Sequence, residues 1–168
     1  MNAKLIFPNR NSGWDLSVHD QNDQLVLAVE VKGTLNTSPE WAAKLRRNIF
    51  VHGIFPEAPF FLMVFPDQLY LWTHAPIYLW THAQIQEDPV LPNYIIDASP
   101  IFQPYFDQAG IASMHISGQN LELIVSSWLG EIIYGESATT IMDESQQWLI
   151  NSGLCEALHG GKIDKVTA

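Results

Sequence analysis

Three residues near the start of the chain have the types and the spacing that metal-assisted cutting of a phosphodiester bond requires. Glu30 and Lys32 stand two positions apart at the end of an apolar run, and Asp15 precedes Glu30 by fifteen positions. Residues two apart on a strand point to the same side of a sheet. Carboxylates are ligands that Mg²⁺ accepts, and a lysine beside them can stabilise phosphate charge and help to keep an attacking water deprotonated. Asp15, Glu30 and Lys32 are therefore candidate catalytic residues, and the two acids are candidate metal ligands.

The side chains meet only if their strands pair in a suitable register. The segment between the two strands is rich in turn formers and predicts a hairpin. We take the hairpin to be symmetric about Gln21 and Asn22. Asp15 then lies opposite Ala28 and diagonal to Glu30. The apolar residues share the other, inward face: Trp14, Leu16, Val18, Leu25, Leu27, Val29 and Val31. The alternative interpretation is an exposed cross-strand ion pair, worth under about 1 kcal/mol.

Ser38-Pro39-Glu40 predicts the start of a helix that runs to about His52. Serine is a good cap, proline suits the first helical position and glutamate complements the helix dipole. The predicted apolar stripe consists of Trp41, Leu45, Asn48, Ile49 and His52. Three basic residues lie away from this stripe: Lys44, Arg46 and Arg47. They either form a solvated face of the helix or contact phosphates, and they are the candidate nucleic-acid-binding residues.

The rest of the chain alternates between strand and helix signals. An apolar strand is expected at 60–65, and residues 69–76 are repeated at 77–84 with six of eight positions identical, which predicts a lengthened strand or an extra hairpin. A short strand at 94–97, a helix or irregular turn at 100–109 and two helices at 118–134 and 143–158 follow. We expect one α/β domain over 1–168, with a sheet core at 1–97 that includes helix 39–52, and C-terminal helical decoration at 98–168. Core packing is expected for Trp41, Trp128 and Trp148.

The charge of the chain is unevenly distributed. The net charge is -10, yet residues 1–60 hold six acids and six bases, whereas residues 61–168 hold 12 acids and 2 bases. Phosphate contacts dominate nucleic-acid affinity, so a nucleic acid would bind near the N-terminal half. The single cysteine, Cys155, and the lack of a long apolar run indicate a cytoplasmic protein that makes no membrane contact.

The same residues carry a resemblance to a known family. Asp15, the strand ending in Glu30-Val31-Lys32, the helix from Pro39 and the strand at 60–65 resemble the core of the PD-(D/E)XK, or restriction-endonuclease-like, superfamily. Residues 14–72 are similar to small bacterial members common in cyanobacteria. The resemblance implies a mixed sheet, made of an antiparallel N-terminal meander, a crossover helix and further strands, flanked by helices. It also implies a Mg²⁺ or Mn²⁺ site formed by Asp15, Glu30 and Lys32, with the Val31 carbonyl as a further ligand.

The chain departs from the family pattern at its start. The superfamily core usually begins with a helix that often supplies another acid, whereas only 14 residues precede Asp15. The site then either lacks a ligand or takes a further one from Glu40, Asp67 or a partner subunit, which would make the protein a homodimer. We expect a Mg²⁺-dependent nuclease that hydrolyses phosphodiester bonds of DNA. The alternative is a catalytically degenerate protein of the same fold that acts as an interaction or regulatory module.

Overall fold

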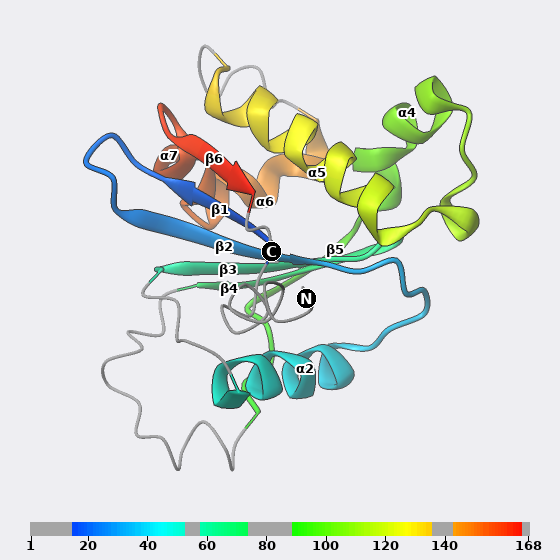
Figure 1. The fold of residues 1–168 in the computed structure, drawn as a ribbon, viewed down its shortest axis with the longest axis horizontal. Helices are drawn as coiled ribbons and strands as arrows, with labels where there is room; N and C mark the ends of the chain where they lie inside the picture. Colours follow the sequence, from blue (N-terminus) through cyan, green and yellow to red (C-terminus); the bar gives the residue numbers. More distant parts are fainter. Residues whose placement is uncertain (1–14, 53–57, 74–88, 136–142, 166–168) are drawn as a thin grey trace, which may run out of the picture.

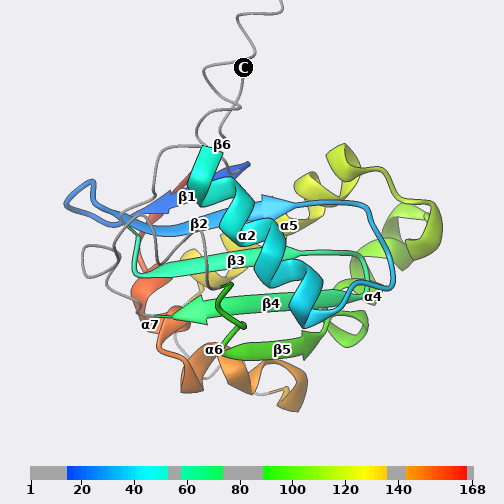
Figure 2. The same ribbon diagram turned by 90° about the horizontal axis from the view of Figure 1, so that it is seen from below.

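A six-stranded mixed sheet with helices on both faces forms the centre of the molecule (Figures 1 and 2). The structure is a computed structural model, and it describes residues 15–52, 58–73, 89–135 and 143–165. The expected α/β class, with a mixed sheet flanked by helices, is confirmed. The expectations for Trp14, and for most of the repeated segment at 69–84, lie outside the described residues.

The strands follow the order β5-β4-β3-β2-β1-β6 across the sheet. Only β2 and β3 are parallel among these neighbours, because helix α2 (Pro39–His52) carries the chain back between them. All other pairs are antiparallel. The bounds of the strands are β1 Leu16–His19, β2 Leu25–Val31, β3 Phe60–Val64, β4 Gln68–Thr73, β5 Tyr94–Asp97 and β6 Lys162–Lys165.

Helices divide between the two faces of the sheet, with α2 on one and the later helices on the other (Figure 1). The α2 face buries aromatic and small side chains of β2, β3 and β4, and the opposite face buries aliphatic side chains of all six strands under the later helices. None of the helices in the part of the chain described here is long and apolar enough to cross a membrane. The later helices are α4 Ser99–Ala109, η2 Ser113–His115, α5 Gly118–Ile133, η4 Glu144–Gln146, α6 Gln147–Asn151 and α7 Leu154–Leu158.

Two helices begin at the predicted residues, and each follows a capping serine. The Ser38 hydroxyl accepts a hydrogen bond from the Trp41 amide at 3.1 Å, and the Ser117 hydroxyl accepts one from the Asn120 amide at 3.1 Å. The single helix expected at 143–158 is wrong, because the chain forms η4, α6 and α7 there. Gly153 separates the last two helices with a φ of 86°, a conformation that glycine adopts without strain.

The predicted hairpin register is wrong by two residues, but the predicted faces are correct for the residues paired before the bulge. Leu16 pairs with Val29, and Ser17, not Asp15, pairs with Ala28. The turn is centred on Asn22, half a residue later than expected, because the amide of Asp20 bonds to the carbonyl of Gln24 at 2.9 Å, and this moves the pairing by one residue. A bulge between Val18 and His19 adds a second shift. Since side chains alternate with a period of two, the shift of two keeps Leu16, Val18, Leu27, Val29 and Val31 on their predicted inward side. Leu25 lies past the bulge, and Val26 packs against this core in its place.

The buried face of α2 also differs from the predicted stripe. Its most buried residues are Ala42, Ala43, Arg46 and Phe50, which pack against the aromatic side of the sheet. Trp41 keeps 42% of its surface exposed, so its expected place in the core is wrong, whereas Trp128 and Trp148 are buried as predicted. Small alanines let the helix approach the sheet closely, and a search for large apolar residues overlooks them.

Candidate metal-binding site

Two hydrogen bonds join Asp15 to the end of β2. Its amide donates to the Val29 carbonyl at 2.8 Å, and its Oδ2 accepts from the Val31 amide at 2.8 Å. The two partners are the residues on either side of Glu30. The carboxylate of Asp15 therefore lies beside the segment that carries Glu30, as the sequence predicted, although the pairing that achieves this differs from the predicted one.

Glu30 and Lys32 form an ion pair at the same end of β2. The Lys32 Nζ lies 3.2 Å from the Glu30 Oε2. The Glu30 side chain is only 12% exposed and that of Lys32 39% exposed, so the acid is largely withdrawn from water while the ammonium reaches solvent. A carboxylate in such a place needs a compensating charge or hydrogen bonds. Lys32 supplies the charge, and its own amide donates to the Val64 carbonyl at 3.0 Å, which anchors it to β3.

The Val31 carbonyl points toward the same region. The N–H and C=O of one strand residue face the same neighbouring strand, and the Val31 N–H faces Asp15. Its carbonyl is therefore on the Asp15 side of β2. The Val31 side chain is buried in the opposite core, which fixes the orientation of the backbone. The structure thus brings together Asp15, Glu30, Val31 and Lys32, the candidate catalytic and metal-binding residues of the sequence.

The donor set suits a hard divalent cation but is small. Two carboxylates and one carbonyl are oxygen ligands, and Mg²⁺ commonly keeps several waters besides one or two protein carboxylates. Within the described ranges, no group of three or more His, Cys, Asp or Glu side chains is arranged to hold a metal ion. The oxygen donors of the described residues are therefore of the type that Mg²⁺ or Mn²⁺ takes, and they are too few for a closed protein cage.

The two suggested sources of a further ligand lie near the start of α2. Asp67, in the turn between β3 and β4, accepts a hydrogen bond from the Asn36 amide at 3.3 Å. Burial raises the pKa of the Tyr70 phenol, and the charges of Asp67 and Glu40 raise it further, against a lowering by its hydrogen bond with Thr37. The charges of Asp67 and Glu40 therefore act on Tyr70, and neither acid joins a three-residue metal-binding cluster in the described residues.

The three predicted nucleic-acid-binding residues do not share one surface. Lys44 is exposed and Arg47 half-buried, whereas Arg46 is only 7% exposed. The Arg46 guanidinium lies 4.3 Å from the ring centre of Phe50 and 5.3 Å from that of Trp72. Burial lowers the pKa of Arg46 to about 9. Arg46 therefore belongs to the aromatic core under α2, and the exposed basic surface of the helix is smaller than predicted.

One positioning contact was missed by the sequence analysis. The Val31 amide holds the Asp15 carboxylate, and only the true register of β1 and β2 places the two groups together. The Asp20–Gln24 turn, which is rich in turn formers, accounts for one of the two shifts in register, and the bulge after Val18 accounts for the other.

In the comparisons with known proteins, no family model, no curated protein and no solved structure matches this chain.

Proposed function

We propose that this protein is a Mg²⁺- or Mn²⁺-dependent nuclease of the PD-(D/E)XK type that hydrolyses phosphodiester bonds of DNA. One observation carries the proposal: Asp15 is bonded to β2 on both sides of Glu30, and the Lys32 ammonium lies 3.2 Å from the Glu30 carboxylate. The path of the chain supports it as well. An antiparallel β1–β2 hairpin, a crossover through α2 and a parallel β3 are the arrangement that this superfamily resemblance implies.

Each residue has a defined role in this proposal. Asp15, Glu30 and the Val31 carbonyl would hold the metal ion, which when bound polarises a water and neutralises phosphate charge. Lys32 would stabilise the charge that gathers on the phosphate oxygens and lower the pKa of the attacking water. Its ion pair holds the ammonium beside Glu30, a proposed metal ligand, so a phosphate bound to the metal ion would lie near this charge.

The distribution of charge supports DNA approaching from the α2 side. Lys44 and Arg47 lie on α2, and there is no lysine or arginine between Arg47 and Lys162. Phosphate groups are attracted by such bases and repelled by the acidic remainder of the chain. The small number of bases predicts weak binding that depends strongly on salt, and a second subunit or a DNA-binding partner would strengthen it.

A second candidate is a non-catalytic interaction module that keeps the fold. It is favoured by the Glu30–Lys32 ion pair, which can serve as a structural pair without a metal, and by the small donor set. The two candidates predict opposite results in a cleavage assay, since only the first requires a chemical step.

The proposal is tested by incubating the purified protein with supercoiled plasmid, single-stranded DNA and RNA in Mg²⁺ or Mn²⁺, with and without chelator. Asp15→Asn should lower the cleavage rate by about 100-fold or more, the loss typical of removing a catalytic charge. Glu144→Gln, which neutralises an exposed carboxylate in η4, is the control and should cut like wild type. Failure of the wild type to cut any substrate, or equal cutting by Asp15→Asn, would overturn the proposal and favour the interaction module.

A further inference from the structure

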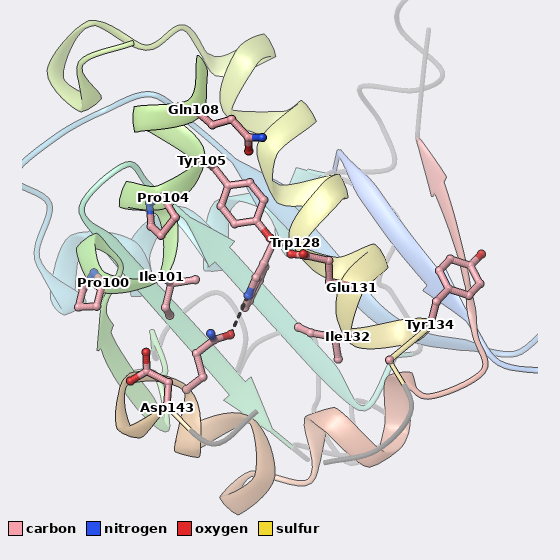
Figure 3. Close-up of a pocket in the computed structure, with 12 residues that line it drawn as sticks. Pro100, Ile101, Pro104, Tyr105, Gln108, Trp128, Glu131, Ile132, Tyr134 and Asp143 are labelled. Atoms are coloured by element: carbon pink, nitrogen blue, oxygen red, sulfur yellow. Dashed lines mark hydrogen bonds between the residues drawn. The ribbon is translucent and has the colours of Figure 1, made fainter. Parts of the chain in front are cut away.

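A cavity of about 720 Å³ lies between α4, α5 and η4 (Figure 3). It is on the face of the sheet opposite α2, so it is separate from the Asp15 and Glu30 site. The volume is in the range of sites that hold small organic molecules. Its central walls are formed by Pro104, Tyr105, Gln108, Trp128, Glu131 and Ile132.

The helical spacing explains why these side chains face one another. Trp128, Glu131 and Ile132 are spaced at i, i+3 and i+4 on α5, which places them on one side of that helix. The Trp128 indole donates a hydrogen bond to the Gln146 Oε1 at 3.0 Å, so it forms a fixed apolar wall with its polar atom satisfied. Its ring also meets that of Phe102 edge-on, with 5.5 Å between the ring centres.

The cavity is acidic as well as aromatic. Among the described residues its charged lining side chains are those of Glu131 and Asp143, and no described Lys, Arg or His lines it. The side chains of Tyr105 and Glu131 point toward one another across the space between α4 and α5 (Figure 3). No lysine or arginine lies between Arg47 and Lys162 in the sequence, so neither α4 nor α5 supplies a base to balance these acids. The local field therefore favours a positive ligand.

We infer that this cavity binds a small organic cation, namely a protonated amine joined to a flat apolar body. The apolar body would pack against Pro104, Tyr105 and Ile132. The ammonium would lie beside the Glu131 carboxylate and near the Tyr105 ring, where ion pairing and cation–π attraction act together. An anion of the same size would be repelled, and a neutral analogue would gain only the apolar contact.

Three probes of similar size separate these contributions: phenethylamine, 2-phenylethanol and phenylacetate. Their affinities are measured by calorimetric titration of the full chain at neutral pH. Phenethylamine should bind most tightly, with an affinity at least about tenfold above that of phenylacetate, which corresponds to one favourable charge contact. Equal affinities for the three probes, or no binding of phenethylamine, would overturn the inference.

Substitutions of lining residues test whether phenethylamine binds in this cavity. Glu131→Gln should lower phenethylamine affinity by about fivefold and leave 2-phenylethanol affinity unchanged, because it removes only the charge. Tyr105→Ala should weaken both probes. Glu156→Gln removes an exposed carboxylate on α7 that does not line the cavity, so it should leave both affinities unchanged. Phenethylamine affinity that is the same in wild type, Glu131→Gln and Tyr105→Ala would contradict the assignment.

Discussion

The Asp15 carboxylate accepts a hydrogen bond of 2.8 Å from the Val31 amide, which joins the start of β1 to the end of β2. This single contact has two consequences. It holds the acid next to Glu30, and it satisfies the backbone donor of Val31, which lies beyond the β1–β2 ladder pairs of the residues that the structure describes. A structural role and a chemical role therefore coincide in Asp15, and substitutions can separate them.

Asparagine and alanine at position 15 should differ in stability but not in activity. Asp15→Asn keeps an oxygen acceptor for the Val31 amide, whereas Asp15→Ala leaves that amide unpaired and should lower the free energy of unfolding by about 1–2 kcal/mol. Both variants lose the carboxylate and should lose cleavage. Urea denaturation together with the cleavage assay checks this. Equal stability of the two variants would show that the Val31 contact contributes nothing.

Replacing Arg46 by methionine should be harmless to the fold. Methionine keeps a long apolar stem against Phe50 and Trp72 and removes a charge whose burial lowers its pKa. Arg46→Met should therefore match or exceed the stability of wild type. Arg46→Ala leaves a cavity and should cost about 2–3 kcal/mol. Thermal unfolding compares the two, and a loss for Arg46→Met as large as that for Arg46→Ala would contradict the role given to the stem.

Tyr70 should make the stability of the protein fall at high pH. Burial, the largest cause, raises the pKa of its phenol above the usual value of 10.0, so the folded state favours the neutral form. As the pH rises through about 10, the phenol ionises in the unfolded state before it ionises in the folded state. The contribution of Tyr70 to the free energy of unfolding is therefore intact below that pH and is lost above it. The free energy of unfolding should decline more steeply in wild type than in Tyr70→Phe above about pH 10. Parallel curves for the two proteins would contradict this.

The β1–β2 turn should be sensitive to the residue at position 23. Asp23 has a φ of 63°, in the left-handed region that glycine adopts freely and β-branched residues avoid. Asp23→Gly should preserve or raise stability, whereas Asp23→Val should lower it by about 1 kcal/mol or more. Denaturant midpoints measure the difference. If valine were tolerated as well as glycine, the turn would not require this conformation.

The sequence predicted the elements of the site better than the contacts within it. The two-residue periodicity of β1 and β2 was enough to place Asp15 and Glu30 on one face, because an error of two in register leaves faces unchanged. The bulge after Val18 depends on packing and hydrogen bonding around the turn, and no local pattern in the sequence predicts it.

Other features depended on tertiary packing that a single sequence does not display. From the sequence, Arg46 was assigned to a basic surface because of its charge. In the structure its aliphatic stem and guanidinium pack against aromatic rings, and the side chain is buried. The strand β6 has three charged residues in the sequence Lys162-Ile163-Asp164-Lys165. It pairs with β1, and Lys165 forms an ion pair of 3.2 Å with Glu122. The cavity between α4 and α5 likewise requires the relative placement of two helices.

The most direct test of the central claim is the rate at which Lys32→Ala nicks supercoiled plasmid in Mg²⁺, measured beside wild type. We predict that wild type cuts and that Lys32→Ala is slower by about 100-fold or more, because the ammonium beside Glu30 is lost. Lys162→Ala, which removes an exposed lysine on β6, should keep the wild-type rate. A Lys32→Ala rate equal to that of wild type, or a wild type that does not cut, would contradict the claim that Asp15, Glu30 and Lys32 form a nuclease site.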